Sequence, residues 1–197
     1  QHEYIGTRKL LIGIVLAVIT FWLFANSLIN VIPNLQTSFG SYLSTISIAV
    51  SLTALFCGMF VVGAGSLADY FGRVRLTIIG LWLNIFGSLL IIVSDYIPLL
   101  LMGRAIQGLS AALIMPATLS LIKAYYHGDK RQRALSLWSI GSWGGSGFAS
   151  LFGGMIATFL SWRWIFVFSI IVPLIAVLLI KGTPESKNQH ASSRQFD

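Results

Sequence analysis

The stretch GSLADYFGRVRL, residues 65 to 76, lies between two long apolar runs and decides how this chain is interpreted. It places a carboxylate, Asp69, and two guanidinium groups, Arg73 and Arg75, in a chain that is only 10% charged. Soluble domains carry about 25% charged residues. Because 56% of the chain is hydrophobic, this depletion indicates that lipid is the solvent of the long apolar runs.

The apolar runs are long enough to span a membrane. A spanning helix needs about 20 apolar residues, because hydrocarbon about 30 Å thick is crossed at about 1.5 Å per residue. The runs that qualify are Leu10–Ile32, Thr45–Ala64, Leu76–Val93, Ile97–Ile122, Ala134–Leu160 and Trp162–Ile180. We expect Pro33 to end the first of them. The sequence therefore predicts an all-α, polytopic membrane protein with six transmembrane helices in residues 1–181, followed by a cytoplasmic linker, 182–197.

Lysine and arginine predict the orientation, because cytoplasmic loops of membrane proteins carry an excess of both. With a cytoplasmic N-terminus, eleven of the 13 cations fall in cytoplasmic segments, while Arg163 lies in an outer loop and Arg104 within a span. The reverse orientation would put those eleven outside. We therefore expect both termini in the cytoplasm. Topology also accounts for the net charge of +7, so no nucleic-acid partner is expected.

The 65–76 stretch has two interpretations from its residues alone. In the first, the arginines hold a loop in the cytoplasm and the glycines form its turn. In the second, Gly65 allows a neighbouring helix to approach closely. Asp69, at a helix end, then pairs with Arg73 four residues later or with the N-terminus of a neighbouring helix.

The stretch resembles the signature loop of the major facilitator superfamily, Gly-x-x-x-Asp-Arg-x-Gly-Arg-Lys/Arg. The matching residues are Gly65, Asp69, Gly72 and Arg73, with Arg75 supplying a second cation one place late. Tyr70 and Val74 stand where that pattern has basic residues. The resemblance implies that these residues form a cytoplasmic latch between the two halves of a transporter.

A second motif lies in the fourth predicted span. Arg104 falls roughly 10 Å into this span, where a cation is costly and marks a functional site unless it snorkels to the outer surface. Gln107 shares its helix face, and Gly108 permits close packing. The pattern resembles the family's Leu-x-x-x-Arg-x-x-Gln-Gly, matched from Leu100 onward. The resemblance implies that Arg104 transfers protons or tunes a nearby acid.

Small residues recur every four positions along the fifth predicted span and predict a groove for helix packing. They are Gly141, Gly145, Ala149 and Gly153, with Gly154 adjacent. The family's antiporter motif, Gly-x-x-x-Gly-Pro-x-x-Gly-Gly, is matched in part, since Ala149 and Ser150 stand where it has Gly-Pro.

Other stretches resemble the fourteen-helix drug:proton antiporter branch of the family. They are SWRWIFVFSIIVP at 161–173, TPES at 183–186 and the terminal FD. The resemblance implies that the chain is the N-terminal six-helix portion of a longer transporter. That branch carries an acid in its first span, where this chain has Ala25 or Asn26. Asn26 and Asn30 share a face and either line a polar cavity or hydrogen-bond to a neighbouring helix.

Faint internal symmetry accompanies these motifs. GSLADYFGRVRL and GMIATFLSWRWI, at 154–165, share glycine first, alanine fourth and arginine near the end. They follow the second and fifth spans, on opposite faces of the membrane. The resemblance to the superfamily implies two inverted three-helix repeats.

The motifs that are absent from the sequence exclude several classes of function. The sequence shows no phosphate loop, metal-ligand cluster or nucleophile–base set, so we expect neither an enzyme nor a cofactor or metal. No acid or histidine falls within a span, so a proton carrier is expected in helices beyond this chain, or at Asp69 or Asp95.

The resemblance implies proton-driven efflux of drugs or other amphipathic toxic compounds by alternating access, from a bacterial plasma membrane. The implied partners are membrane lipid, a hydrophobic or cationic small molecule, protons, and the missing C-terminal helices of the same protein. Two alternatives remain. One is a lipid, sugar or metabolite transporter of the same superfamily, and the other is a six-helix membrane assembly protein that transports nothing.

Overall fold

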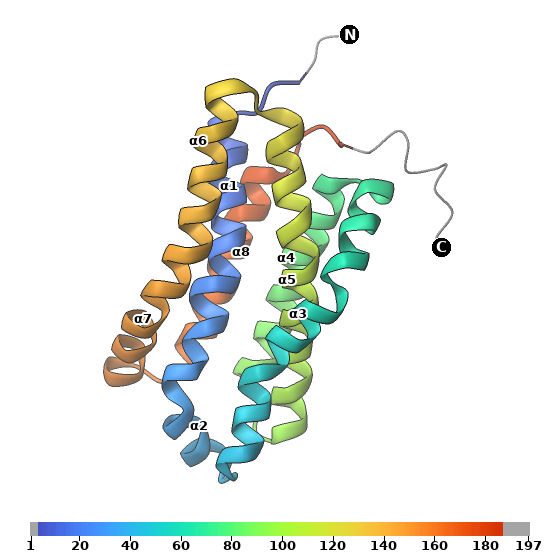
Figure 1. The fold of residues 1–197 in the computed structure, drawn as a ribbon. Helices are drawn as coiled ribbons and strands as arrows, with labels where there is room; N and C mark the ends of the chain where they lie inside the picture. Colours follow the sequence, from blue (N-terminus) through green and yellow to red (C-terminus); the bar gives the residue numbers. More distant parts are fainter. Residues whose placement is uncertain (1–3, 187–197) are drawn as a thin grey trace.

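A computed structural model of the chain describes residues 4–186, which form a bundle of long helices (Figure 1). The first pass along the bundle consists of α1 (Arg8–Ile19), the π-helix η1 (Thr20–Ala25), the 3-10 helix η2 (Asn26–Val31) and α2 (Ile32–Phe39). The next three passes are α3 (Leu43–Phe71), α4 (Arg73–Ile92) and α5 (Ile97–Tyr125). The last two are α6 (Gly128–Ser139) with the π-helix η3 (Ile140–Gly144) and α7 (Gly145–Phe159), and then α8 (Arg163–Ile180). The all-α prediction is confirmed for the described residues.

Both ends of the helical chain lie at the same end of the bundle. The helix α1 begins, and α8 ends, at the top of Figure 1, which we call the proximal end. The opposite end, where α2 leads into α3, is called the distal end. This arrangement follows from an even number of passes along the bundle.

Five helices within residues 4–186 are long and apolar enough to cross a membrane. They are Arg8–Phe39, Leu43–Phe71, Arg73–Ile92, Ile97–Tyr125 and Arg163–Ile180. The remaining predicted span, Ala134–Leu160, falls on the continuous helical run of α6, η3 and α7. This run has the length to span, but its charged first turns and its many glycines and serines make it less apolar.

Two expectations about helix ends are wrong. Pro33 does not end the first helix, because it lies in the first turn of α2, where a missing backbone N–H costs nothing, and the helix continues to Phe39. The connection between the second and third predicted spans, expected as a loop at 65–76, is also much shorter than the gap between the apolar runs. The helix α3 runs to Phe71 and α4 begins at Arg73, so Gly72 alone connects them, with a φ of 120°. Both helices extend past their apolar runs because polar side chains are also compatible with helix in water.

The packing confirms two inverted three-helix repeats. The fourth pass, α5, packs against the second and third passes, α3 and α4. In the same way, the first pass packs against the fifth and sixth, with η1 and η2 on α7, and α1 on α8. The third and sixth passes, α4 and α8, pack against each other. Exchanging the two sets of three passes therefore reproduces the same contacts, as a pseudo-two-fold axis requires.

Candidate functional site

Arg104 is buried between three passes of the bundle, with 1% of its surface exposed. Its guanidinium points into the bundle, so the snorkelling alternative is wrong. The acceptors are the carbonyl oxygens of Ala25 (3.1 Å), Ala49 (3.0 Å) and Val50 (2.9 Å), the hydroxyl of Thr53 (3.0 Å) and the amide oxygen of Gln107 (3.0 Å). Arginine has five N–H donors, and each has an acceptor here.

None of these acceptors carries a formal charge. Within residues 4–186, the ion pairs do not include Arg104. Its hydrogen bonds therefore join the first pass, α3 and α5, while its positive charge lacks a carboxylate partner in this part of the chain. A buried charge with neutral hydrogen-bond partners still attracts an anion, because the low-dielectric surroundings screen it poorly.

A line of polar side chains leads from Arg104 to the interface between α4 and α8. The amide nitrogen of Gln107 donates to the Ser88 hydroxyl at 3.1 Å, and this hydroxyl donates to the Ser169 hydroxyl at 3.2 Å. The amide nitrogen of Asn84 also donates to Ser169, at its carbonyl oxygen (2.9 Å) and hydroxyl (3.1 Å). All of these side chains are buried. The α4–α8 pair is thus connected to Arg104 through Gln107.

Gly108 brings α3 close enough for Arg104 to reach it. A Cβ atom at Gly108 would lie 2.6 Å from the Thr53 carbonyl oxygen and 2.7 Å from the Phe56 Cβ. Both distances are too short for any side chain. The backbones of α3 and α5 therefore touch at this glycine, one turn from Arg104.

The asparagines of the first pass lie beside this site without joining its hydrogen bonds. Asn26 is half-buried and Asn30 is exposed. Among the residues described, neither side chain has a hydrogen-bond partner. Asn26 directly follows Ala25, whose carbonyl accepts from Arg104 at the point where π-helical geometry changes to 3-10. Departures of this kind from α-helical geometry often accompany functional sites.

The small residues of the fifth pass lie mostly against the first pass. A Cβ at Gly153 would come within 2.8 Å of the Ser27 carbonyl oxygen, and one at Gly145 within 3.2 Å of the Trp22 Cβ. At Gly141 the nearest atom would be 3.5 Å away, on Val15. The backbone carbonyl of Ala149 accepts a hydrogen bond from the Ser27 hydroxyl at 3.1 Å. Gly154 differs, since a Cβ there would meet no atom of the described chain within 4 Å.

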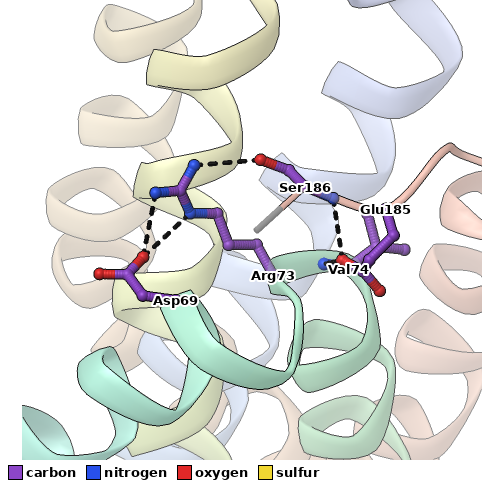
Figure 2. A network of polar contacts seen from close by, with 5 residues as sticks. All are labelled: Asp69, Arg73, Val74, Glu185 and Ser186. Atoms are coloured by element: carbon purple, nitrogen blue, oxygen red, sulfur yellow. Dashed lines mark hydrogen bonds and ion pairs between the residues drawn. The ribbon is translucent and has the colours of Figure 1, made fainter. Parts of the chain in front are cut away.

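The 65–76 stretch forms a polar network at the proximal end (Figure 2). The carboxylate of Asp69 accepts from Nε of Arg73 at 3.1 Å and from its Nη2 at 3.0 Å. The other terminal nitrogen of Arg73 donates to the Ser186 hydroxyl at 3.0 Å, and its backbone N–H donates to the Ser186 carbonyl at 3.0 Å. The Arg75 side chain is exposed, and a Cβ at Gly65 would meet only Pro116, at 3.6 Å.

Glu185 is a member of this network that the sequence did not reveal. Its carboxylate accepts from the backbone N–H groups of Val74 (2.8 Å) and Arg75 (3.1 Å), in the first turn of α4. A helix N-terminus has unpaired N–H groups and a positive dipole end, so a carboxylate is favoured there. A Cβ at Gly72 would overlap this carboxyl group. In the sequence, Glu185 is visible only as an acidic residue soon after the last predicted span, and nothing there indicates its partner.

The comparisons agree with this fold and these motifs. Residues 10–196 match the family model described as Major Facilitator Superfamily. The chain belongs to the major facilitator superfamily. It is 67% identical over all 197 residues to the quinolone resistance protein NorB of Staphylococcus aureus, in strains JH9 and Newman. It spans 42% of the length of those relatives, so it corresponds to the N-terminal portion of a larger protein.

Solved structures of the superfamily share the fold. A D-xylose-proton symporter matches with a TM-score of 0.77 at 17% identity, over 90% of this chain and 48% of the symporter. The peptide transporter POT in complex with sulfate matches with a TM-score of 0.74 at 17% identity, over 87% of this chain and 36% of the transporter. Together with the apolar helices, these findings make the chain part of a multi-pass membrane protein.

Proposed function

We propose that this chain is the N-terminal half of a secondary transporter that exports drugs or other amphipathic toxic compounds, driven by protons, from a bacterial cell. The observation that carries the proposal is the 67% identity to a quinolone resistance protein over the whole chain. The sugar and peptide transporters of similar fold are only 17% identical and favour neither cargo.

The proximal end faces the cytoplasm in this proposal. The cations outside the spans support it, because those of residues 4–186 lie at that end except for Arg163. Asp69, Gly72 and Arg73 then belong to a cytoplasmic latch, and Glu185 and Ser186 bring the start of the 182–197 linker into it.

Arg104 is the coupling residue of this half. Its charge lacks a carboxylate partner within residues 4–186, while its hydrogen bonds hold it rigidly in place. A carboxylate of the second half that approached Arg104 would be stabilised in its ionised form. Movement away from Arg104 would favour protonation of that carboxylate. Alternating approach and withdrawal would thereby link proton uptake and release to the transport cycle.

The substrate binds on the face of the first pass beside this site. Phe21 and Trp22 of η1 pack with Cys57 of α3, next to the half-buried Asn26. Aromatic faces supply apolar contact and attract cations, which suits amphipathic drugs. Phe24 does not belong to this face, because its ring packs against Phe152 of α7 and Phe168 of α8.

Transport in inside-out vesicles that contain the full-length protein tests this proposal. We expect a quinolone to accumulate in the vesicles when an inward-acidic proton gradient is imposed, and a protonophore to abolish the accumulation. Vesicles with an empty vector are the control. Uptake of xylose or a dipeptide without quinolone movement would favour the metabolite alternative. If none of these compounds accumulates although the protein is fully expressed, the result would favour a six-helix membrane assembly protein that transports nothing.

A further inference from the structure

The helices α4 and α8 both begin with an arginine, at opposite ends of the bundle. Arg73 is the first residue of α4 at the proximal end, and Arg163 is the first residue of α8 at the distal end. The two helices are the third passes of the inverted repeats and pack against each other in opposite directions. Each arginine therefore lies beside the end of the other helix.

At the proximal end, residues that follow α8 bind the start of α4. The Arg73 guanidinium and backbone N–H both donate to Ser186, and the Glu185 carboxylate accepts from the N–H groups of Val74 and Arg75. The chain after α8 is further held by the Tyr125 hydroxyl, which donates to the Pro184 carbonyl. We call this group of contacts the proximal clasp.

At the distal end, the start of α8 binds the end of α4 in the same way. Nε of Arg163 donates to the Ile92 carbonyl at 3.1 Å, and Nη2 donates to the Ser94 carbonyl at 2.8 Å. The guanidinium carbon lies 4.6 Å from the ring centroid of Trp162. Trp162 is 2% exposed, and its indole N–H donates to the Ser38 hydroxyl at 3.0 Å. We call these contacts the distal clasp.

The charges of the two clasps match the dipole of α4. Glu185 places a negative charge at the N-terminus of α4, where backbone N–H groups lack partners. Arg163 places a positive charge at the C-terminus, where carbonyl groups lack partners. Arg163 is the first residue of α8, and Glu185 follows α8 by five residues. The helix α4 is therefore capped at both ends by the partner it packs against.

The lengthwise position of α4 on α8 matters for the candidate site. Between the clasps, Ser88 of α4 and Ser169 of α8 share a hydrogen bond, and Ser88 also accepts from Gln107, which contacts Arg104. A shift of α8 along α4 by one residue, about 1.5 Å, would break the Ser88–Ser169 bond. The Ser88 hydroxyl would then lose the acceptor that orients it for the hydrogen bond from Gln107.

We propose that Arg163 and Trp162 form a distal counterpart of the proximal clasp, and that the two clasps together fix the lengthwise position of α4 on α8. Arg163 and Glu185 are positioning residues that act on Arg104 through Ser88 and Gln107. The part of this inference that concerns transport rests on the proposed function. The part that concerns helix position does not.

Hydrogen exchange of the full-length protein tests the helix-position part without any transport. In Arg163→Ala, we expect amide exchange in the last turn of α4 to rise about tenfold, as the loss of charge-assisted bonds predicts, with the first turn of α4 unchanged. In Glu185→Ala, the N–H groups of Val74 and Arg75 should exchange faster and the last turn should not. Arg133→Ala, at an exposed arginine of α6, is the matched control and should change neither end.

The transport part has its own measurement. We expect Arg163→Ala to lower the maximal quinolone flux about fivefold or more while leaving KM within about twofold, because a positioning residue does not touch substrate. Arg163→Lys should recover part of the flux, since it keeps the charge but loses the second donor. Where the alanine variants fail to fold, Arg163→Lys and Glu185→Gln replace them in the exchange measurement.

The inference would be overturned if amide exchange at both ends of α4 were unchanged in Arg163→Ala and Glu185→Ala. It would also be overturned if either variant accelerated amide exchange equally in all helices. A changed KM at constant maximal flux would assign Arg163 to substrate binding instead. If the wild-type protein moves no quinolone while the exchange results hold, the proposed function fails and the clasps remain.

Discussion

Arg73 and Arg104 are the same residue type in two very different surroundings. The side chain of Arg73 is 18% exposed, at the proximal end, and pairs with the carboxylate of Asp69. Arg104 is 1% exposed, between three passes, and all its acceptors are neutral. Within residues 4–186, Arg73 at the end of the bundle therefore has a counterion, while Arg104 in its interior has none. An uncompensated buried charge is costly, which makes Arg104 the residue with the larger expected functional effect.

The largest effect is expected at Arg104. We predict that Arg104→Ala abolishes proton-driven transport, about a hundredfold or more, because the coupling charge is lost. Flux in vesicles, normalised to protein amount, is the measurement, and we expect expression to be maintained. Arg104→Lys keeps the charge but cannot supply five donors, so it should retain part of the flux. Flux at the wild-type level in Arg104→Ala would show that the buried charge does not couple transport.

The second-largest effect is expected from a variant that disturbs the α3–α5 contact beside Arg104 and leaves the charge of Arg104 in place. We predict that Gly108→Val lowers both thermal stability and flux, because its side chain would displace the Thr53 carbonyl and push α3 away from α5. The expected cost is about 1–3 kcal/mol, the usual range for overpacking. Thermal unfolding in detergent checks the prediction. Gly58→Val is the control, since a Cβ at Gly58 meets no described atom within 4 Å.

A smaller effect is expected in the proposed latch around Arg73. Gly72→Ala places a Cβ at a φ of 120° and against the Glu185 carboxyl group, so the proximal clasp should open. We predict a loss of about 1–3 kcal/mol, the range for a strained backbone position, with faster exchange at Val74. Gly65→Ala is the control, because its Cβ would make only an ordinary 3.6 Å contact with Pro116. Equal effects of the two variants would argue against a special role for Gly72.

The smallest effect is expected at the ion pair itself. Asp69→Asn removes the charge from a partly exposed i,i+4 pair, and such pairs contribute about 0.2–1 kcal/mol. We predict little change in the unfolding temperature, together with a measurable fall in flux if the pair belongs to a latch. The stability change should shrink in high salt, because salt screens exposed charges. A stability loss as large as that of Gly108→Val would reverse the proposed ranking of the two regions.

The sequence predicted where the helices lie, but it predicted only some of the contacts between them. The apolar runs and the Asp69–Arg73 spacing are properties of nearby residues. The structure has helices over all six runs, five of them apolar enough to span a membrane, and it has the Asp69–Arg73 ion pair. Pro33 was misjudged because a proline after an apolar run resembles a terminator, whereas the first turn of a following helix tolerates it. Gly154 resembled its neighbours in spacing but lies off the contact face, because two adjacent glycines cannot both face the same helix.

Helix length, apolar content and motif spacing are local quantities, and they were enough to predict an all-helical membrane protein of this superfamily. The packing of the bundle was needed to show which groups satisfy Arg104, that Glu185 caps α4, and that Arg163 reaches the far end of the same helix. Apart from Gln107, these partners are separated by 51 to 111 positions along the chain. Long side chains that lie at helix ends can reach several neighbours, and only the packing of the bundle selects among them.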